Sequence, residues 1–233
     1  ECARKKEWTK PVLDEGNDIE IKDGRHPVVE AVIGKSHFIP NDLIVNEKKR
    51  LLLITGPNMA GKSTVLRQSA LICMLAQMGA FVPAAFAKIG IVDRIFSRVG
   101  ASDNISQGQS TFMVEMMETA RILRQATKKS FVILDEIGRG TSTFDGLALA
   151  WAVMEELLKR ANGQVRTLFA THYHELTALE NKFSGIFNMN IAIKEWNNDI
   201  VFLRKLIPGP ADKSYGIEVA RLAGVPAHVV HRA

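Results

Sequence analysis

Residues 56–64 read GPNMAGKST and place two glycines, a lysine and two hydroxyl side chains in one loop. An apolar run, LLLIT, precedes the loop, and an apolar stretch, VLRQSALICML, follows it. The spacing matches the pattern G-x-x-x-x-G-K-[ST], in which backbone N–H groups converge on phosphate oxygens at a helix N-terminus. An ordinary glycine-rich turn with a solvated lysine is the structural alternative. The buried strand expected before the loop and the helix expected after it favour phosphate binding.

The positions of this loop have distinct expected tasks. Gly56 and Gly61 remove the Cβ atoms that would block a phosphate. Lys62 supplies a mobile positive charge for the β and γ phosphates, and Ser63 offers a hydroxyl to Mg²⁺. The predicted nucleotide-binding residues of the loop are Gly56, Pro57, Asn58, Met59, Ala60, Gly61, Lys62, Ser63 and Thr64.

Two further apolar runs end in side chains that could act on a phosphate. The run at 131–134 ends in Asp135, expected to hold Mg²⁺ through its water shell, and Glu136, expected to orient or deprotonate an attacking water. The run at 167–171 ends at His172, from which an imidazole could donate a hydrogen bond toward a γ phosphate. A solvated loop start is the alternative for the carboxylates, and a structural histidine for His172.

The elements that position these groups alternate after Arg50 between apolar runs and helical patterns. The runs at 51–54, 131–134 and 167–171 indicate parallel strands covered on both faces. One helix is expected over 112–127, with an apolar stripe of Phe112, Met116, Ala120 and Leu123. A second is expected from a cap at Asp145 to Asn162-Gly163, with a stripe of Leu147, Trp151, Met154 and Leu158.

The first fifty residues have a different hydrophobic pattern. Short alternating pieces at 19–21, 28–33 and 43–45 predict a small antiparallel sheet. Residues 1–17 are polar and lack a signal-peptide pattern, so we expect them to be the tail of a helical domain in a longer protein. The apolar stretch at 70–87 is interrupted by Gln77, Gly79 and Pro83, which predicts a buried helix rather than a membrane span.

Composition narrows the class of protein only partly. A chain of 233 residues with 46% hydrophobic side chains can bury one large core. The net charge of +5 comes from scattered basic residues, so contact with nucleic acid is permitted without being indicated. Two cysteines offer neither a disulfide framework nor a paired-cysteine metal site. We therefore expect a reducing compartment, the cytoplasm, or the nucleus if the source is eukaryotic.

Several longer motifs together resemble the ATPase domain of the MutS family of DNA mismatch-recognition proteins. The resemblance covers the chain from residue 24 to its end. It rests on GPNMAGKST, DNISQGQSTFMVEM at 103–116, LDEIGRGTSTFDGLALAWA at 134–152, FATHYHEL at 169–176 and KSYGIEVARLAGVP at 213–226.

The resemblance implies a fold class and a division of the chain. The expected architecture is an α/β P-loop NTPase of the ABC-type ATPase class, with a mostly parallel central sheet flanked by helices and a small antiparallel N-terminal sheet. The expected ATPase domain spans 18–208, and a helix-turn-helix dimerisation element spans 209–233. The expected cofactors are ATP or ADP and Mg²⁺.

The resemblance also implies roles for particular residues. The catalytic set is Glu136, Lys62, His172 and Ser110, with Ser110 reaching the γ phosphate held by a second subunit; the residues alone show only a Ser-Thr pair that caps a helix. The metal is held by Ser63 and Asp135. Phe38 stacks on the adenine, although a hydrophobic plug is an alternative. The GRGTST segment resembles a loop through which paired sites sense each other, or it is a simple linker.

The C-terminal residues present a choice between two interfaces. Helical stretches on either side of Gly224 and Pro226 look like a DNA-binding helix-turn-helix. The second stretch offers Arg232 and two histidines but no series of side chains for base edges. The resemblance implies that this unit packs against a partner subunit.

The sequence thus favours a Mg²⁺-dependent ATPase that drives a DNA clamp in a longer repair protein. Expected partners are a second MutS-like subunit, like or unlike, DNA through domains missing from this chain, and repair proteins, with no membrane. A nucleotide-gated dimerisation module is the alternative, as is a paralogue acting in recombination. A transport or chromosome-maintenance ATPase is disfavoured because the LSGGQ motif is missing.

Overall fold

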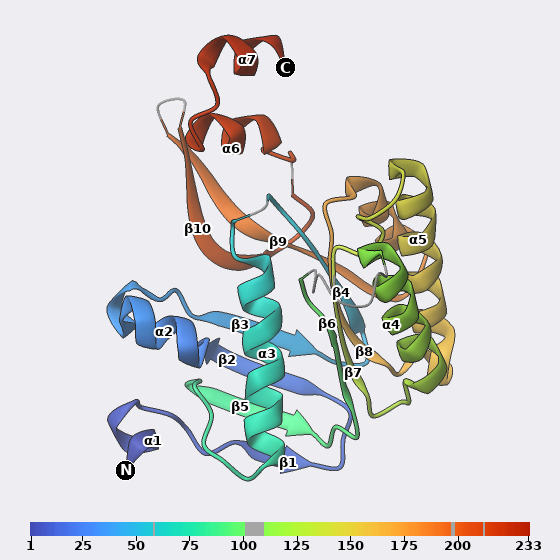
Figure 1. Cartoon of the computed structure of the whole chain (residues 1–233). Helices are drawn as coiled ribbons and strands as arrows, with labels where there is room; N and C mark the ends of the chain where they lie inside the picture. Colours follow the sequence, from blue (N-terminus) through green and yellow to red (C-terminus); the bar gives the residue numbers. More distant parts are fainter. Residues whose placement is uncertain (58, 101–109, 197–198, 212) are drawn as a thin grey trace.

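The computed structural model describes residues 1–57, 59–100, 110–196, 199–211 and 213–233. Its architecture is α/β, with two sheets and a long central helix, α3 (Lys62–Gln77) (Figure 1). Both sheets are mixed. The expected mostly parallel central sheet is present, whereas the smaller N-terminal sheet, expected to be antiparallel, contains one parallel pair.

The larger sheet contains the three apolar runs of the sequence as neighbouring strands. Its order is β10-β9-β4-β8-β7-β6. Pairing is parallel throughout except between β9 and β10, which are antiparallel. The strands are β4 (Lys49–Thr55), β6 (Ile95–Arg98), β7 (Phe131–Asp135), β8 (Arg166–Ala170), β9 (Gly185–Trp196) and β10 (Asp199–Pro208). The prediction of parallel strands buried on both faces is confirmed.

The smaller sheet has the order β1-β5-β2-β3. Its strands are β1 (Val12–Asp14), β2 (Ile19–Gly24), β3 (Asn41–Val45) and β5 (Phe86–Gly90). β2 pairs antiparallel with β3 and β5, whereas β1 pairs parallel with β5. The sheet therefore takes in residues 12–14, which the sequence placed ahead of it.

The expected strand at 28–33 is wrong, because these residues form the helix α2 (Pro27–Ile33). His26 caps this helix by accepting a hydrogen bond from the Val29 N–H, and Pro27 occupies the first turn, where its missing N–H costs nothing. Val28 and Val32 are exposed. The β-branched residues suggested a strand, but the capping geometry at the start of the segment determines the structure.

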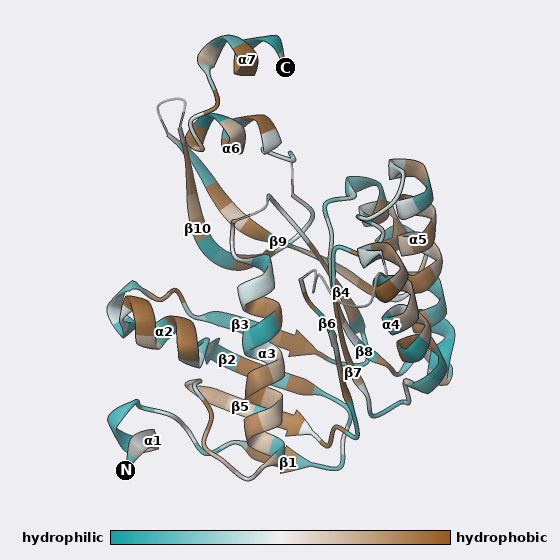
Figure 2. Cartoon of the chain, in the orientation of Figure 1, coloured by the Kyte–Doolittle hydropathy of each residue, from teal (hydrophilic) through white to brown (hydrophobic). Residues whose placement is uncertain are grey.

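Helix α3 lies between the two sheets and forms one core with both. Leu66, Ile72 and Cys73 of α3 pack with Ile19 and Ile21 of β2 and with buried side chains of β4, β7 and β8. Helices α4 (Thr111–Gln125) and α5 (Thr143–Lys159) cover the opposite face of the larger sheet. Figure 2 shows hydrophobic colour along the strands and parts of α3, and also on α2, α4 and α5.

Both predicted surface helices exist, with corrected details. The buried positions of α4 are Glu115, Thr119 and Ile122, beside which Met116 and Leu123 are only partly buried. The cap of α5 is Ser142, whose hydroxyl oxygen accepts from the Asp145 N–H. Asp145 lies in the first turn and accepts a bond from the Ser142 hydroxyl, so it does not cap the helix as expected.

The remaining elements are short. They are α1 (Cys2–Lys5), α6 (Gly216–Leu222), α7 (Ala227–Arg232), and the 3₁₀ segments η1 (Lys35–His37), η3 (Arg160–Gly163) and η4 (His174–Asn181). Helices α6 and α7 lie at the end of the molecule beyond the β9–β10 hairpin, and neither contains a buried residue (Figure 1). Within the described ranges, no helix is long and apolar enough to cross a membrane.

Candidate functional site

The loop at 56–64 connects the end of β4 to the start of α3, as its sequence predicts. Gly56 and Gly61 have φ of 131° and 115°, and Met59 has φ of 71°. Gly61 is the N-cap of α3 and makes no side-chain capping bond. A Cβ added to Gly61 would meet no atom within 4 Å, so it would project into open space. The helix N-terminus thus faces an open space. A side chain at position 61 would project into that space, whereas glycine leaves it unoccupied. Asn58 lies outside the described residues.

Lys62 is folded back onto its own loop. Its side chain is only 4% exposed, and Nζ donates to the carbonyl oxygens of Gly56 at 2.5 Å and Pro57 at 3.1 Å. Burial lowers the pKa of Lys62, while the nearby carboxylates of Glu136 and Asp135 oppose that shift.

Ser63 and Asp135 meet across the gap between α3 and the end of β7. The Ser63 hydroxyl donates to Asp135 Oδ2 at 2.6 Å. The other carboxylate oxygen, Oδ1, is buried and has no hydrogen-bond partner in the described structure. Burial raises the pKa of Asp135. A hydroxyl beside a carboxylate with a spare oxygen is a donor set that fits Mg²⁺. No cluster of three or more His, Cys, Asp or Glu side chains competes for a metal in the described ranges.

Glu136 follows directly and has an unusual backbone. Its φ is 57°, a left-handed conformation that is uncommon for a residue other than glycine, and its N–H donates to the Ala170 oxygen at 2.9 Å. Its carboxylate is mostly buried and accepts from Arg139 Nη1 at 2.6 Å. Arg139 itself is 64% exposed. The expected catalytic carboxylate is therefore bonded to an arginine whose side chain lies largely in solvent.

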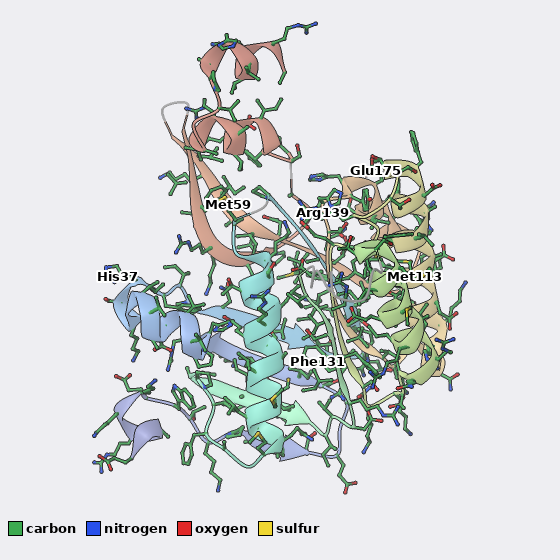
Figure 3. The ribbon with its side chains drawn as sticks, viewed as in Figure 1. His37, Met59, Met113, Phe131, Arg139 and Glu175 are labelled. Carbon is green, nitrogen blue, oxygen red and sulfur yellow. The ribbon has the colours of Figure 1, made fainter. Side chains whose placement is uncertain are left out.

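Three cavities adjoin this point and share Arg139 in their walls. One of 340 Å³ includes Lys62, Ser63, Thr64 and Glu136. Another of 340 Å³ includes Ser63, Asp135, Glu136 and Thr111. The third, of 390 Å³, includes Gly56, Pro57 and His172. Figure 3 shows Met59 and Arg139 at the same end of the larger sheet, away from Phe131 at the start of β7. The predicted loop, carboxylates and histidine thus meet at one edge.

His172 follows β8 and is exposed, but its environment still affects its titration. Burial lowers the pKa of His172, which the Glu136 carboxylate opposes. An imidazole N–H can donate a hydrogen bond, as the expected role of His172 requires. Because His172 lines the third cavity, its imidazole could contact a group bound there.

Phe38 lines a separate cavity of 240 Å³ beside the loop. Its ring is 8% exposed, and Gly61, Thr64 and Arg204 are among the other wall residues. Arg204 lies in a bulge of β10 with φ of 56°. Asn41 fixes this bulge, since its Nδ2 donates to the Arg204 oxygen at 3.0 Å and its Oδ1 accepts from the Leu206 N–H at 2.6 Å.

Ser110 is exposed and caps α4 by accepting from the Met113 N–H at 3.1 Å. The residues before it, 101–109, lie outside the described part of the chain. Ser110 does not line any of the four cavities described above, although its neighbour Thr111 does. Unlike the loop, the carboxylates and His172, this predicted catalytic residue is not brought to the edge of the sheet within one chain.

Sequence reasoning did not single out four residues at or beside this site. Arg139, Glu115 and Arg204 line the cavities, and Tyr173 bonds to the Gly138 carbonyl oxygen in the turn after β7. Arg139 and Tyr173 lie in GRG and THYHE, so their closeness to expected site residues was a usable signal. Glu115 looks like an ordinary polar helix position, and no local pattern marks Arg204.

The fold and this edge define an α/β domain with mixed sheets and a polar site where strands end. The model of the family described as MutS domain V matches residues 52–233. The chain is 75% identical to the DNA mismatch repair protein MutS of Nitratidesulfovibrio vulgaris and 72% identical to that of Oleidesulfovibrio alaskensis, over all of its 233 residues and 26% of each relative. It is 62% identical to MutS of Lachnoclostridium phytofermentans over 99% of its residues and 25% of that relative. The chain belongs to the MutS family of DNA mismatch repair proteins. It spans about a quarter of the length of these relatives.

Proposed function

We propose that this chain is the Mg²⁺-dependent, ATP-hydrolysing domain of a MutS-type mismatch repair protein. The observation that carries the proposal is the meeting of Ser63 and Asp135 at 2.6 Å beside the glycine loop and Lys62. A loop suited to phosphate, a metal-type donor pair and a neighbouring carboxylate at one edge form the constellation that phosphoryl transfer requires. These features support assignment to the P-loop, ABC-type class that the sequence suggests.

Each residue of the site would have a separate role in ATP hydrolysis. Lys62 would release the carbonyl oxygens of its loop and bind the β and γ phosphates. Ser63 and Asp135 would hold Mg²⁺, which supplies charge neutralisation for the developing phosphoryl transition state. Glu136 would orient or deprotonate water once Arg139 leaves it, and His172 would donate toward the γ phosphate.

The cavity at Phe38 would receive the base of ATP or ADP. It shares Gly61 and Thr64 with the cavity that contains Lys62, so a single nucleotide can occupy both. Phe38 offers a ring face, and the guanidinium of Arg204 offers a flat cation. The loop residues Pro57, Met59, Ala60 and Thr64 would then lie along the nucleotide, as the sequence suggests.

The site would be completed by a second subunit, like or unlike. Ser110 is exposed at a helix N-terminus and outside the cavities of its own chain, as expected of a residue that serves a neighbour. The helices α6 and α7 expose Ile217, Leu222 and Val229, which supports packing against a partner rather than DNA readout. DNA and repair proteins would be bound through other parts of a longer protein, and we place the protein in the cytoplasm.

The other functions weighed from the sequence are less well supported. A nucleotide-gated dimerisation module would not need Glu136 in a special backbone conformation beside the metal-type pair. The similar proteins are named as mismatch repair proteins, which does not favour a recombination paralogue. The ATPase proposal accounts for more of the site.

The experiment that tests the proposal compares ATP binding and hydrolysis by the wild-type chain and the Glu136→Gln variant. The variant keeps the side-chain volume and loses the carboxylate. We expect turnover to fall by about 100-fold or more while the affinity for a non-hydrolysed ATP analogue stays within about threefold. The readouts are steady-state phosphate release with Mg²⁺ and equilibrium titration of a fluorescent analogue.

Glu175→Gln is the matched control, because Glu175 is an exposed carboxylate on η4 that lines none of the cavities described above. It should turn over ATP at the wild-type rate. A wild-type chain that binds no ATP, or turnover unchanged in Glu136→Gln, would contradict the proposed function.

A further inference from the structure

Both backbone polar groups of Gly138 are bound by side chains from other elements. Its N–H donates to Glu115 Oε1 at 2.6 Å, and its carbonyl oxygen accepts from the Tyr173 hydroxyl at 3.2 Å. Gly138 has φ of 88°, and a Cβ there would lie 2.5 Å from the Gly146 oxygen. The residue is therefore fixed from two sides and packed against α5.

This turn carries Glu136. The left-handed conformation of Glu136 costs free energy and persists only where surrounding contacts impose it. Glu136 is held at its N–H by Ala170, and the chain is next held at Gly138. The backbone is thus held at Glu136 itself and again two residues later. Under the proposed function, the Glu136 carboxylate faces the attacking water.

The Glu115 contact is buried and charged. The side chain of Glu115 is 8% exposed, and Oε2 lies 3.8 Å from Arg98 Nη2. Arg98 also pairs with Glu118 at 3.0 Å, one turn along α4. A charge-assisted bond to a backbone N–H in a buried setting is among the stronger hydrogen bonds in proteins. Helix stability alone does not explain a buried glutamate, because its carboxylate bonds to another element.

The Tyr173 contact comes from the end of β8. Tyr173 is 5% exposed and follows His172 directly. Its backbone N–H donates to the Thr171 hydroxyl at 3.0 Å, which holds the main chain at this residue. Burial raises the pKa of Tyr173, so its hydroxyl remains a donor at neutral pH.

We propose that Glu115 and Tyr173 are positioning residues that hold the turn after β7 so that Glu136 faces the phosphate loop. This inference rests on the proposed ATPase function. It assigns to Glu115 and Tyr173 a role in turnover, through the backbone of Gly138, rather than in nucleotide binding.

The test measures kcat and nucleotide affinity for three variants of the full chain. Tyr173→Phe removes one hydroxyl, Glu115→Ala removes the carboxylate, and Glu115→Gln restores an oxygen that can accept from Gly138. We expect kcat to fall roughly 10- to 100-fold in Tyr173→Phe and Glu115→Ala, because small displacements of a catalytic group have effects of this order. Glu115→Gln should recover most of that loss, and analogue affinity should stay near wild type in all three.

Glu118→Ala is the matched control, because Glu118 pairs with the same arginine but does not reach Gly138. It should leave kcat near wild type. A double-mutant comparison separates positioning from general damage: in the Glu136→Gln background, Glu115→Ala and Tyr173→Phe should cause little further loss. A purely structural role would lower activity equally in both backgrounds.

The outcomes separate the two proposals. A wild-type chain without ATP turnover overturns the proposed function itself. A wild-type chain that turns over ATP, together with kcat within about twofold of it in Tyr173→Phe and Glu115→Ala, overturns only the positioning role. Equal losses of kcat in Glu115→Ala and Glu118→Ala would also overturn it.

Discussion

Two regions of the molecule differ in the contacts that hold their side chains. One is the candidate site at the ends of β4, β7 and β8, and the other is the pair of C-terminal helices. At the strand ends, Lys62, Ser63 and Glu136 each bond to another group of the same chain. Helices α6 and α7 bury no residue, and Leu222 and Val229 are about half exposed. The side chains at the strand ends are held by contacts within this chain, whereas α6 and α7 present apolar surface that the described residues leave exposed.

Under the proposed function, this difference separates the residues that are preorganised for chemistry from the residues that would respond to a partner. Groups that must meet within a few ångströms are placed by strands and a helix that share a core. Groups expected to respond to a partner, Ser110 and the C-terminal helices, lie outside that core. Each of the following predictions tests one side of this contrast.

The largest expected effect comes from mixing two inactive variants, Lys62→Ala and Ser110→Ala. Each alone should lose about 100-fold or more in ATP turnover. In an equimolar mixture, half of the dimers pair the two variants, and each such dimer has one composite site with both side chains intact. Activity should therefore return to about a quarter of the wild-type rate.

The control replaces Ser110→Ala by a chain that carries both substitutions, which leaves no intact composite site in any pairing. Ser110→Ala also removes the cap of α4, worth ~1 kcal/mol, so the melting temperature of each variant is measured alongside. Absence of recovery between chains that demonstrably exchange would mean that the site is complete within one chain, and the contrast drawn above would fail for Ser110.

A second prediction compares two leucines, one from each region. Leu168→Ala in β8 should lower the free energy of unfolding by about 2–5 kcal/mol, because the side chain is fully buried between the layers. Leu222→Ala on α6 should change it by less than about 0.5 kcal/mol at dilute concentration, yet weaken self-association. Chemical denaturation and sedimentation velocity measure the two quantities. A large loss of monomer stability in Leu222→Ala would show that the chain does use this surface internally.

The smallest expected effect concerns α2, which forms part of the wall of the Phe38 cavity. Burial lowers the pKa of His26, with a further contribution from Arg67, so the folded chain favours the neutral ring that caps the helix. Stability from this group is therefore present above the ordinary pKa of histidine and is lost as pH falls through the lowered value. His26→Asn keeps a capping oxygen that does not titrate.

Thermal melting from pH 7.5 to pH 5 checks this prediction. The wild-type chain should lose up to ~1 kcal/mol more than His26→Asn over that range, the usual worth of an N-cap. Parallel melting curves for the two proteins would mean that the cavity wall is held by other contacts.

Much of the fold and part of the site could be predicted from the sequence. Runs such as FVIL and TLFA identify buried parallel strands because few other structures bury consecutive apolar residues. The glycine loop, Asp135 and Glu136 could be found because their chemistry depends on neighbours in sequence. The comparisons also confirm the family that the longer motifs indicated.

The rest depends on contacts between distant segments. The valine content of α2 predicts a strand, whereas the cap at His26 makes the segment a helix. Glu115 gains its contact only when α4 packs beside Gly138. Arg204 reaches the Phe38 cavity because Asn41, far away in sequence, holds a bulge in β10. Local periodicity carries no information about such pairings.

The burial of Cys73 has a practical consequence. This thiol is fully buried in the helix that begins at the glycine loop of residues 56–64, and burial raises its pKa to about 12. A reagent that modifies thiols can reach it only when α3 opens from the sheets. In a chain with Cys2 replaced by serine, the rate at which the Cys73 thiol is modified would measure how often α3 opens. If nucleotide slows the modification of Cys73, the ratio of the two rates would report how far a bound nucleotide suppresses the opening of α3.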